Sequence, residues 1–258
     1  MRGLDGKVAI VPGGATKIGQ AVVAAFRAAG VRVMVADINA EAGAAMEGEG
    51  VGFRACDLRD DAQIDALVAA TMESFGRIDF LVNVACSYLD NGAASTRAEW
   101  LESFDVNVVG SVILMQKVRA ELAKNRGAIV NFGSISSRVA QTGRWLYPVS
   151  KAAILQLTRN QAMDLAPDGI RVNAVSPGWT WSNIMDELTG GDRAKTDRVA
   201  APFHLLGRTG NPDEVAAAVL FLCSDEAAFI TGTDIRVDGG YTAMGPERAE
   251  PAIPLLME

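Results

Sequence analysis

The sequence predicts an α/β fold, in which a single doubly wound parallel β-sheet of about seven strands carries helices on both faces. Short runs rich in β-branched residues alternate with longer Ala- and Leu-rich stretches, the pattern of strands joined by crossover helices. Seven such runs indicate a parallel sheet covered on both sides. No Pro/Gly/Ser-rich linker and no repeat divides the 258 residues, so we expect one domain over 1–258.

The elements follow in order along the chain. The predicted strands are 7–11, 31–36, 52–55, 78–82, 128–132, 171–175 and 234–237. The predicted helices are 18–29, 40–48, 61–75, 98–124, 147–166 and 212–223. The C-terminal tail, 241–258, carries Pro246, Pro251 and Pro254, which exclude a long helix. We expect this tail to pack on a neighbouring subunit.

Composition and charge restrict the partners. Hydrophobic residues make up 49% of the chain and charged residues 21%, as in ordinary globular proteins. A net charge of -7 argues against nucleic acid or an anionic membrane surface as a partner. No apolar run approaches the roughly 20 residues that cross a bilayer. The expected partner is a small-molecule substrate.

The cysteines and the histidine are informative by their arrangement. Cys56, Cys86 and Cys223 are dispersed, and the first residues lack the apolar stretch of a signal peptide. We therefore expect a reducing, cytoplasmic location. His204 is the only histidine and no Cys/His cluster exists, so we expect a structural His204 and no metal.

A glycine-rich loop follows the first predicted strand and precedes an apolar helix. Gly13 and Gly19 are six residues apart, and glycines at such a place let the backbone approach a pyrophosphate at the helix N-terminus. We expect Gly13, Lys17, Ile18 and Gly19 to bind a dinucleotide cofactor. The alternative is a plain turn.

Asp37 ends the second predicted strand, about 20 residues after the loop, where a carboxylate accepts hydrogen bonds from the adenosine ribose. Because a 2'-phosphate would be repelled there, the expected cofactor is NAD. Lys17, beside the phosphates, leaves dual use of NADP open. A simple helix-capping role for Asp37 is the other interpretation.

Tyr147, Lys151 and Ser134 provide a phenol, a cation and a hydroxyl. Tyr147 and Lys151 are four residues apart, so both project from the first turn of the predicted helix 147–166. A phenol loses its proton at about pH 10 in water and needs nearby positive charge to act as a base at neutral pH. The group predicts proton transfer to or from an alcohol oxygen.

These motifs occur in an order and spacing that resemble the short-chain dehydrogenase/reductase family, with its Rossmann-type sheet, over nearly the whole chain. The matching positions are the Gly13 to Gly19 loop, Asp57, 83–86, Asn107, Ser134, Tyr147 with Lys151, Asn173, Pro177 with Gly178, and 237–240.

The resemblance implies a role for each matching residue. Tyr147 would be the general acid/base, Ser134 would hold the substrate oxygen, and Lys151 would bind the nicotinamide ribose and lower the tyrosine pKa. Asn107 would bend its helix and hold a relay water. Further cofactor contacts would come from Asp57, Leu58, Asn83, Ala85, Pro177, Gly178, Thr180 and Ser182. The resemblance also implies a homotetramer built on helices 98–124 and 147–166, and a variable lid at about 183–206.

Four positions depart from the family pattern. Pro12 replaces a threonine, Lys17 replaces the middle glycine of the loop, and Val84 and Cys86 replace an asparagine and a glycine. None of these replacements removes a catalytic group, but they put the cofactor geometry in doubt.

The substrate is expected to be a polar ring, such as a sugar, sugar acid or sulfonated sugar, whose secondary alcohol is oxidised to a ketone or lactone. The stretch 136–145 is polar, and Arg144 binds an anion or forms a surface ion pair. Gln141, Trp145 and Trp179 are further candidates for substrate contact, and Trp181 lies near them in the sequence. The alternatives are a dehydrogenase of a cyclic alcohol or dihydrodiol, an NADPH-dependent ketoreductase, and a non-catalytic cofactor-binding protein.

Overall fold

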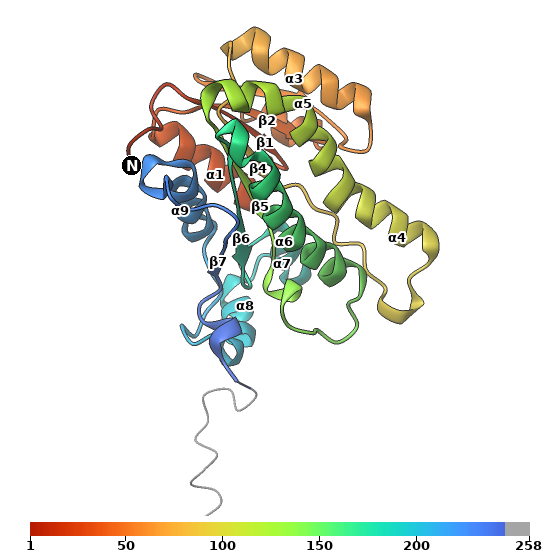
Figure 1. Cartoon of the computed structure of the whole chain (residues 1–258). Helices are drawn as coiled ribbons and strands as arrows, with labels where there is room; N and C mark the ends of the chain where they lie inside the picture. The colour runs from red at the N-terminus through yellow and green to blue at the C-terminus, as the bar shows by residue number, and fades with distance from the viewer. Residues whose placement is uncertain (246–258) are drawn as a thin grey trace, which may run out of the picture.

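The computed structural model describes residues 1–245 and contains a seven-stranded parallel sheet (Figure 1). The strand order is β3-β2-β1-β4-β5-β6-β7, with every neighbouring pair parallel. The strands are β1 (Val8–Pro12), β2 (Arg32–Asp37), β3 (Val51–Ala55), β4 (Phe80–Asn83), β5 (Ala128–Phe132), β6 (Arg171–Pro177) and β7 (Asp234–Val237). The predicted fold class and all seven strands are confirmed, with shifts of one or two residues at most ends.

Helices cover both faces of the sheet (Figure 1). They are α1 (Lys17–Ala28), α2 (Ala40–Ala44), α3 (Asp61–Phe75), α4 (Arg97–Phe104), α5 (Gly110–Asn125), α6 (Leu146–Leu165), α7 (Asn183–Thr189), α8 (Arg193–Ala200) and α9 (Pro212–Cys223). The predicted helices 61–75, 147–166 and 212–223 are confirmed to within one residue.

Two predicted helices were wrong in extent. The helix predicted at 98–124 is interrupted by a π-helical segment, Asp105–Val109, which separates α4 from α5. The helix predicted at 40–48 ends at Ala44, because Gly48 pairs with Val51 in a bridge that turns the chain into β3.

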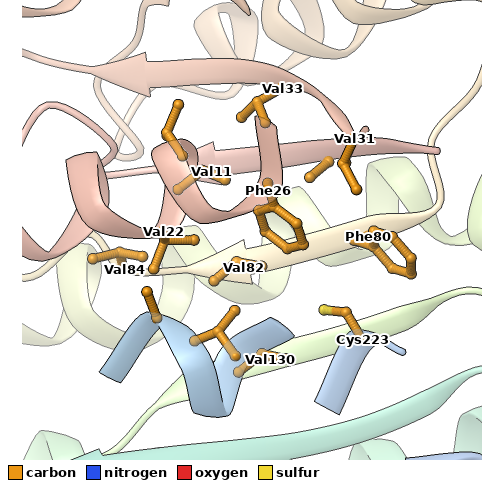
Figure 2. Close-up of a cluster of buried hydrophobic side chains, with 14 of the residues drawn as sticks. Val11, Val22, Phe26, Val31, Val33, Phe80, Val82, Val84, Val130 and Cys223 are labelled. Carbon is orange, nitrogen blue, oxygen red and sulfur yellow. The ribbon is translucent and has the colours of Figure 1, made fainter. Parts of the chain in front are cut away.

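The two faces of the sheet receive alternate side chains of each strand, since successive residues point to opposite sides. Ala9 and Val11 pack against α1 and α9, whereas Ile10 packs on the other face with residues of α3 and α5. Figure 2 shows Val22 and Phe26 of α1 lying over the strands, and Cys223 of α9 belongs to the same apolar cluster. Each face therefore has its own apolar core.

The strand order reverses between β1 and β4, because the chain builds outward from β1 to β3 and then returns to the other side of β1. In open parallel sheets, ligands bind at the carboxyl ends of the strands near such a reversal. The topology therefore points to the loops after β1, β2, β4, β5 and β6.

The lid predicted at 183–206 contains two helices, α7 and α8, separated by Gly190 and Gly191. Both glycines have positive φ, 62° and 86°, a conformation that L side chains rarely adopt. Of the tail predicted at 241–258, residues 246–258 lie outside the described part of the chain. In the part that the structure describes, no helix is long and apolar enough to cross a membrane.

Candidate active site

A cavity of about 710 Å³ opens at the carboxyl edge of the sheet. Its walls come from the loops after β1, β2, β4, β5 and β6, together with the start of α6 and helix α7. Twelve of the predicted site residues line it: Ile18, Asp37, Ser134, Gln141, Arg144, Tyr147, Lys151, Pro177, Gly178, Trp179, Thr180 and Ser182.

The glycine loop requires the backbone to approach closely. A Cβ at Gly13, whose φ is 77°, would lie 2.5 Å from the Ala85 nitrogen, and a Cβ at Gly19 would lie 2.3 Å from the Gly13 oxygen. The Thr16 hydroxyl caps α1 by accepting the Gly19 N–H at 3.2 Å. Ala15, Thr16 and Ile18 line the cavity, so the helix N-terminus opens to it and fits the phosphates of a dinucleotide.

Lys17 makes its contacts with α7 and does not line the cavity. Its backbone N–H donates to the Asn183 side-chain oxygen at 2.8 Å, and its ammonium lies 2.8 Å from an Asp186 oxygen. Its predicted contact with cofactor phosphates stays a prediction. The ion pair shows that the lysine charge already has a partner.

Asp37 is held at the end of β2, with its carboxylate beside the glycine loop. One of its oxygens accepts the Ala15 N–H at 3.1 Å and the other accepts the Asn39 N–H at 3.0 Å. Because Asp37 also lines the cavity, its position suits a ribose diol.

Four predicted cofactor residues, Asp57, Leu58, Asn83 and Ala85, do not line the cavity. The Asp57 carboxylate is bound by Arg59 at 2.7 Å, which holds its pKa below the usual value, and Leu58 is buried beneath Gly110. Asn83 donates to the Asn131 side chain at 2.8 Å in the core. The Ala85 N–H donates to the Pro12 carbonyl at 2.9 Å. In the structure these four residues support neighbouring segments.

Ser134, Tyr147 and Lys151 converge on one wall and are nearly buried, with 6%, 7% and 3% of their surfaces exposed. The Lys151 ammonium donates to the Phe132 carbonyl at 2.9 Å and lies 5.7 Å from the centre of the Tyr147 ring. The helical spacing read from the sequence does bring the phenol and the cation together.

The pKa of Tyr147 in the chain without a cofactor is determined mainly by burial. Burial raises it well above its usual value, and neighbouring Tyr88 and Cys86 raise it further. A hydrogen bond with Ser134 and the positive charge of Arg144 lower it, but by less. The chain alone therefore favours the protonated phenol, because removing a phenolate from water costs more than these groups return.

Asn107 lies in the π-helical segment, as its predicted bending role implies, but outside the cavity lining. Its side-chain oxygen accepts the Ser87 N–H at 2.6 Å, and its amide donates to the Ser150 hydroxyl at 3.0 Å. Asn107 thus joins the loop after β4 to the helix that carries Tyr147 and Lys151. A relay water stays a prediction.

Among the cavity residues that were not predicted from the sequence, Tyr88 and Asp90 make direct contacts with Tyr147. The Tyr88 ring stacks on the Tyr147 ring with 5.0 Å between centres. Asp90 accepts the backbone N–H groups of Trp145 at 2.9 Å, Tyr147 at 3.0 Å and Gly92 at 3.0 Å. No sequence signal marks either residue, because their partners in α6 are more than 50 positions away.

Not all of the predicted substrate residues line the cavity. Gln141 accepts a hydrogen bond from the Ser136 hydroxyl at 2.7 Å and faces the cavity, as does Arg144. Trp179 lines the cavity while packing on Phe203 at 5.8 Å. Trp145 is 53% exposed and does not line the cavity.

The region beside Trp179 has a structural histidine. The N–H of Trp179 donates to His204 at 3.3 Å, and the other ring nitrogen of His204 lies 2.9 Å from the Ala200 carbonyl. His204 is 4% exposed, which agrees with the structural role expected for it. Trp181 packs under Arg193 and does not line the cavity. Within residues 1–245, no group of His, Cys, Asp and Glu side chains is arranged to hold a metal ion.

Comparison with known sequences finds one family model and several relatives that are named as dehydrogenases. A family model described as "Enoyl-(Acyl carrier protein) reductase" matches residues 13–242. D-threitol dehydrogenase of Mycolicibacterium smegmatis is 36% identical, over 93% of this chain and 94% of that protein. L-fucose dehydrogenase of Bos taurus is 35% identical, over 91% and 89%. The 2,5-dichloro-2,5-cyclohexadiene-1,4-diol dehydrogenase of Sphingobium indicum is 36% identical, over 95% and 100%.

Solved structures also match this chain over nearly its whole length. The aldohexose dehydrogenase of Thermoplasma acidophilum superposes with a TM-score of 0.86 at 31% identity, covering 94% of this chain and 96% of that one. The 3-ketoacyl-(acyl-carrier-protein) reductase of Brucella melitensis, complexed with NADH, gives a TM-score of 0.83 at 28% identity, covering 93% and 99%. With the family model and these relatives matching over nearly its full length, the chain belongs to the short-chain dehydrogenase/reductase family and is an oxidoreductase that acts on alcohols.

Proposed function

We propose that the protein uses NAD to oxidise a secondary alcohol of a polar ring substrate, such as a sugar, sugar acid or sulfonated sugar, to a ketone or lactone. The observation that carries the proposal is the single cavity of about 710 Å³. Its lining joins Ser134, Tyr147 and Lys151 with the start of α1 and with Asp37.

The residues divide the work of proton transfer. The Ser134 hydroxyl binds the substrate oxygen, and Tyr147 takes the hydroxyl proton as general base. Lys151 holds the ribose next to the nicotinamide. When bound, the oxidised nicotinamide ring accepts the hydride and adds a positive charge near Tyr147. Since burial raises the Tyr147 pKa in the chain alone, added positive charge is what makes the base form accessible.

The choice of NAD over NADP rests on Asp37 and on the pairing of Lys17. The Asp37 carboxylate lines the cavity beside the loop and would repel a 2'-phosphate. The Lys17 ammonium, which would otherwise attract that phosphate, lies 2.8 Å from an Asp186 oxygen. Both observations support NAD, and the NADH bound in the Brucella melitensis reductase shows that this fold accepts that cofactor.

The polar ring is supported by two lines of evidence. Ser136, Gln141 and Arg144 place polar groups on the substrate side of the cavity, and the Trp179 indole adds a flat apolar surface. Relatives named for fucose, aldohexose and threitol act on polyhydroxylated compounds. A cyclic diol is the second candidate, because one relative at 36% identity is named for a dichlorocyclohexadiene diol.

A panel of alcohols tests the proposal. Purified protein should form NADH from at least one sugar or sugar acid, with kcat/KM far higher for NAD than for NADP. Turnover of cyclic diols or simple cyclic alcohols alone, with no sugar accepted, would replace the polar ring with the second candidate. A strong preference for NADPH would indicate a ketoreductase instead.

The Tyr147→Phe variant separates catalysis from cofactor binding. It removes only the phenolic hydroxyl, so turnover should fall by at least about 1,000-fold, the scale on which essential acid/base groups contribute. NADH binding, followed by fluorescence, should stay within a few-fold of the parent protein. Unchanged turnover would remove Tyr147 from the mechanism, and a protein that binds NADH without turning over any alcohol would be a binding module.

We further propose a homotetramer and a cytoplasmic location. Val109, Val149 and Met163 on the expected interface helices are 46%, 46% and 79% exposed, which supports burial against another subunit. The three cysteines are free thiols, which suits a reducing compartment. Light scattering should give four times the 27.2 kDa chain mass, and a monomer would contradict the tetramer.

A further inference from the structure

Arg144 lies closer to the Tyr147 ring than Lys151 does. The guanidinium carbon of Arg144 is 4.6 Å from the ring centre, whereas the Lys151 ammonium is 5.7 Å away. A cation within about 6 Å of an aromatic face interacts with it electrostatically. Two cations therefore act on one phenol, one from each side of it in the sequence.

The two cations differ in their other partners. The Lys151 ammonium is bound by the Phe132 carbonyl at 2.9 Å. Among the described residues, the Arg144 guanidinium has no hydrogen-bond acceptor in reach, and its nearest anion is an Asp90 oxygen 4.0 Å from Nε. Its position is thus defined by the Tyr147 ring and by this loose ion pair.

Asp90 is itself fixed. Its side chain is 2% exposed, and its two oxygens accept the N–H groups of Gly92, Trp145 and Tyr147. The backbone of Tyr147 and the charge that faces Arg144 are therefore held by one carboxylate. Arg144 is placed over the ring by the same residue that fixes the start of the helix.

The remaining neighbours of the phenol carry no charge. Tyr88 and Cys86 approach it from the loop after β4, and Ser134 approaches it from the loop after β5. Burial and these two neighbours raise the Tyr147 pKa, and Arg144 is the charged group that lowers it. In the chain alone, the groups that lower the Tyr147 pKa against the effect of desolvation are Arg144 and the Ser134 hydroxyl.

We propose that Arg144 is a second activating cation for Tyr147, a positioning residue that acts on the reaction only through the ring beneath it and does not bind a substrate anion. The inference rests on the proposed role of Tyr147 as general base. It deepens that role by assigning the charge that assists it.

The inference also narrows the substrate class. Arg144 and Lys151 are the two cations among the described residues that line the cavity, which also contains Asp37, Asp90 and Glu187. With one cation assigned to Tyr147 and the other to Tyr147 and the cofactor ribose, neither is left for a carboxylate or sulfonate. A neutral sugar or polyol ring is the substrate that fits.

The test is the pH dependence of kcat for alcohol oxidation in Arg144→Met, which removes the charge and keeps a long side chain. Loss of a nearby cation raises the pKa of the base, so the rising limb of the profile should move to higher pH. We expect a shift of about one unit, which is a roughly tenfold lower kcat on that limb. The deficit should narrow above the shifted pKa, and KM for a neutral sugar should change less than threefold.

Two further variants serve as controls. Arg144→Lys keeps the charge, so its rising limb should move to higher pH by no more than half as much as that of Arg144→Met. Arg138→Met removes an arginine that pairs with Asp234 and does not line the cavity, so its profile should match the parent protein. Thermal melting and NADH binding show whether each variant folds, and Arg144→Gln, which also removes the charge, replaces Arg144→Met if that variant does not fold.

Three outcomes would overturn the inference. In Arg144→Met these outcomes are a rising limb of the pH profile that does not move, a loss of kcat that is the same at every pH, or a steep rise of KM for an acidic sugar with kcat unchanged. Tyr147→Phe distinguishes failure of the inference from failure of the proposed function. If its residual activity keeps the same limb as the parent protein, Tyr147 is not the base and the proposed function fails instead.

Discussion

Helices α1 and α6 both begin beside the cavity, but their N-termini are satisfied in different ways. Thr16, the residue that precedes α1, accepts the Gly19 N–H with its own hydroxyl. Trp145, which precedes α6, offers no such acceptor, and Asp90 accepts the Trp145 and Tyr147 N–H groups from 55 and 57 residues away. The start of α1 is determined locally, whereas the start of α6 depends on a distant loop.

This difference separates the two halves of the active site. On the cofactor side, consecutive residues supply the glycine loop, the Thr16 cap and the start of α1. One short segment therefore forms the whole cofactor cradle. On the catalytic side, the loop after β4 supplies the cap through Asp90, a stacked ring through Tyr88 and a link to Asn107 through Ser87. Tyr147 is therefore more vulnerable to changes elsewhere in the chain than the cofactor cradle is.

Asp90→Ala should produce the largest effect. It leaves the part-buried Tyr147 N–H at the start of α6 without its acceptor, which costs about 1 to 3 kcal/mol of unfolding free energy. A displacement of Tyr147 near 1 Å would lower kcat by about 100-fold. Urea unfolding and steady-state kinetics measure the two effects. Asp90→Asn keeps an acceptor and should retain most of the stability; a wild-type kcat in the Ala variant would contradict the remote cap.

Thr16→Ala should have a smaller effect, confined to the cofactor side. Loss of an N-cap hydroxyl costs about 1 kcal/mol. Because Thr16 lines the cavity near the expected phosphates, KM for NAD should rise while kcat at saturating NAD stays near the parent value. Thr16→Ser keeps the hydroxyl and is the matched control. A large loss of kcat in the Ala variant would show that the two halves are not separate.

Glu214→Gln should have the smallest effect, because Glu214 belongs to the local cap of α9 and does not line the cavity. A hydrogen bond from Arg208 and the Asn211 N–H lower the pKa of Glu214 from about 4.5 to about 2. The lowered pKa adds stability above the unfolded value, and this contribution is lost as pH falls toward 2. Because the side chain is 40% exposed, the variant should lose under about 1 kcal/mol at pH 7. Unfolding at several pH values should show this difference vanishing in acid; a constant difference would be contrary evidence.

Local features were read correctly from the sequence. Five of the seven strands are mostly buried apolar runs, with only the edge strands β3 and β7 largely uncovered, and the Tyr147–Lys151 spacing needs only a helix to place both side chains together. Nearly all of the fold and the core of the site follow from such short-range patterns. The interruption at Asp105–Val109 does not, because 98–124 has continuous helical composition and the π segment is accompanied by contacts of Asn107 with the distant Ser87 and Ser150.

Contacts between distant segments account for the rest. Tyr88 and Asp90 lie in a loop with no motif, and their importance comes from Tyr147. The expected lowering of the Tyr147 pKa considered the charges of a nearby lysine and of the cofactor ring, whereas the burial that raises it depends on the packing of several segments. Trp145 and Trp179 look alike in the sequence, but only Trp179 lines the cavity.

Two contacts attach α7 to the glycine loop, and ionic strength affects them differently. Asn183, the first residue of α7, accepts the Lys17 backbone N–H, a contact between neutral groups that salt scarcely weakens. One turn later, Asp186 meets the Lys17 ammonium with both side chains about one-third exposed, so dissolved ions screen their attraction. Salt therefore weakens the second contact and leaves the first in place, so at high ionic strength Asn183 is the residue through which α7 stays attached to the glycine loop.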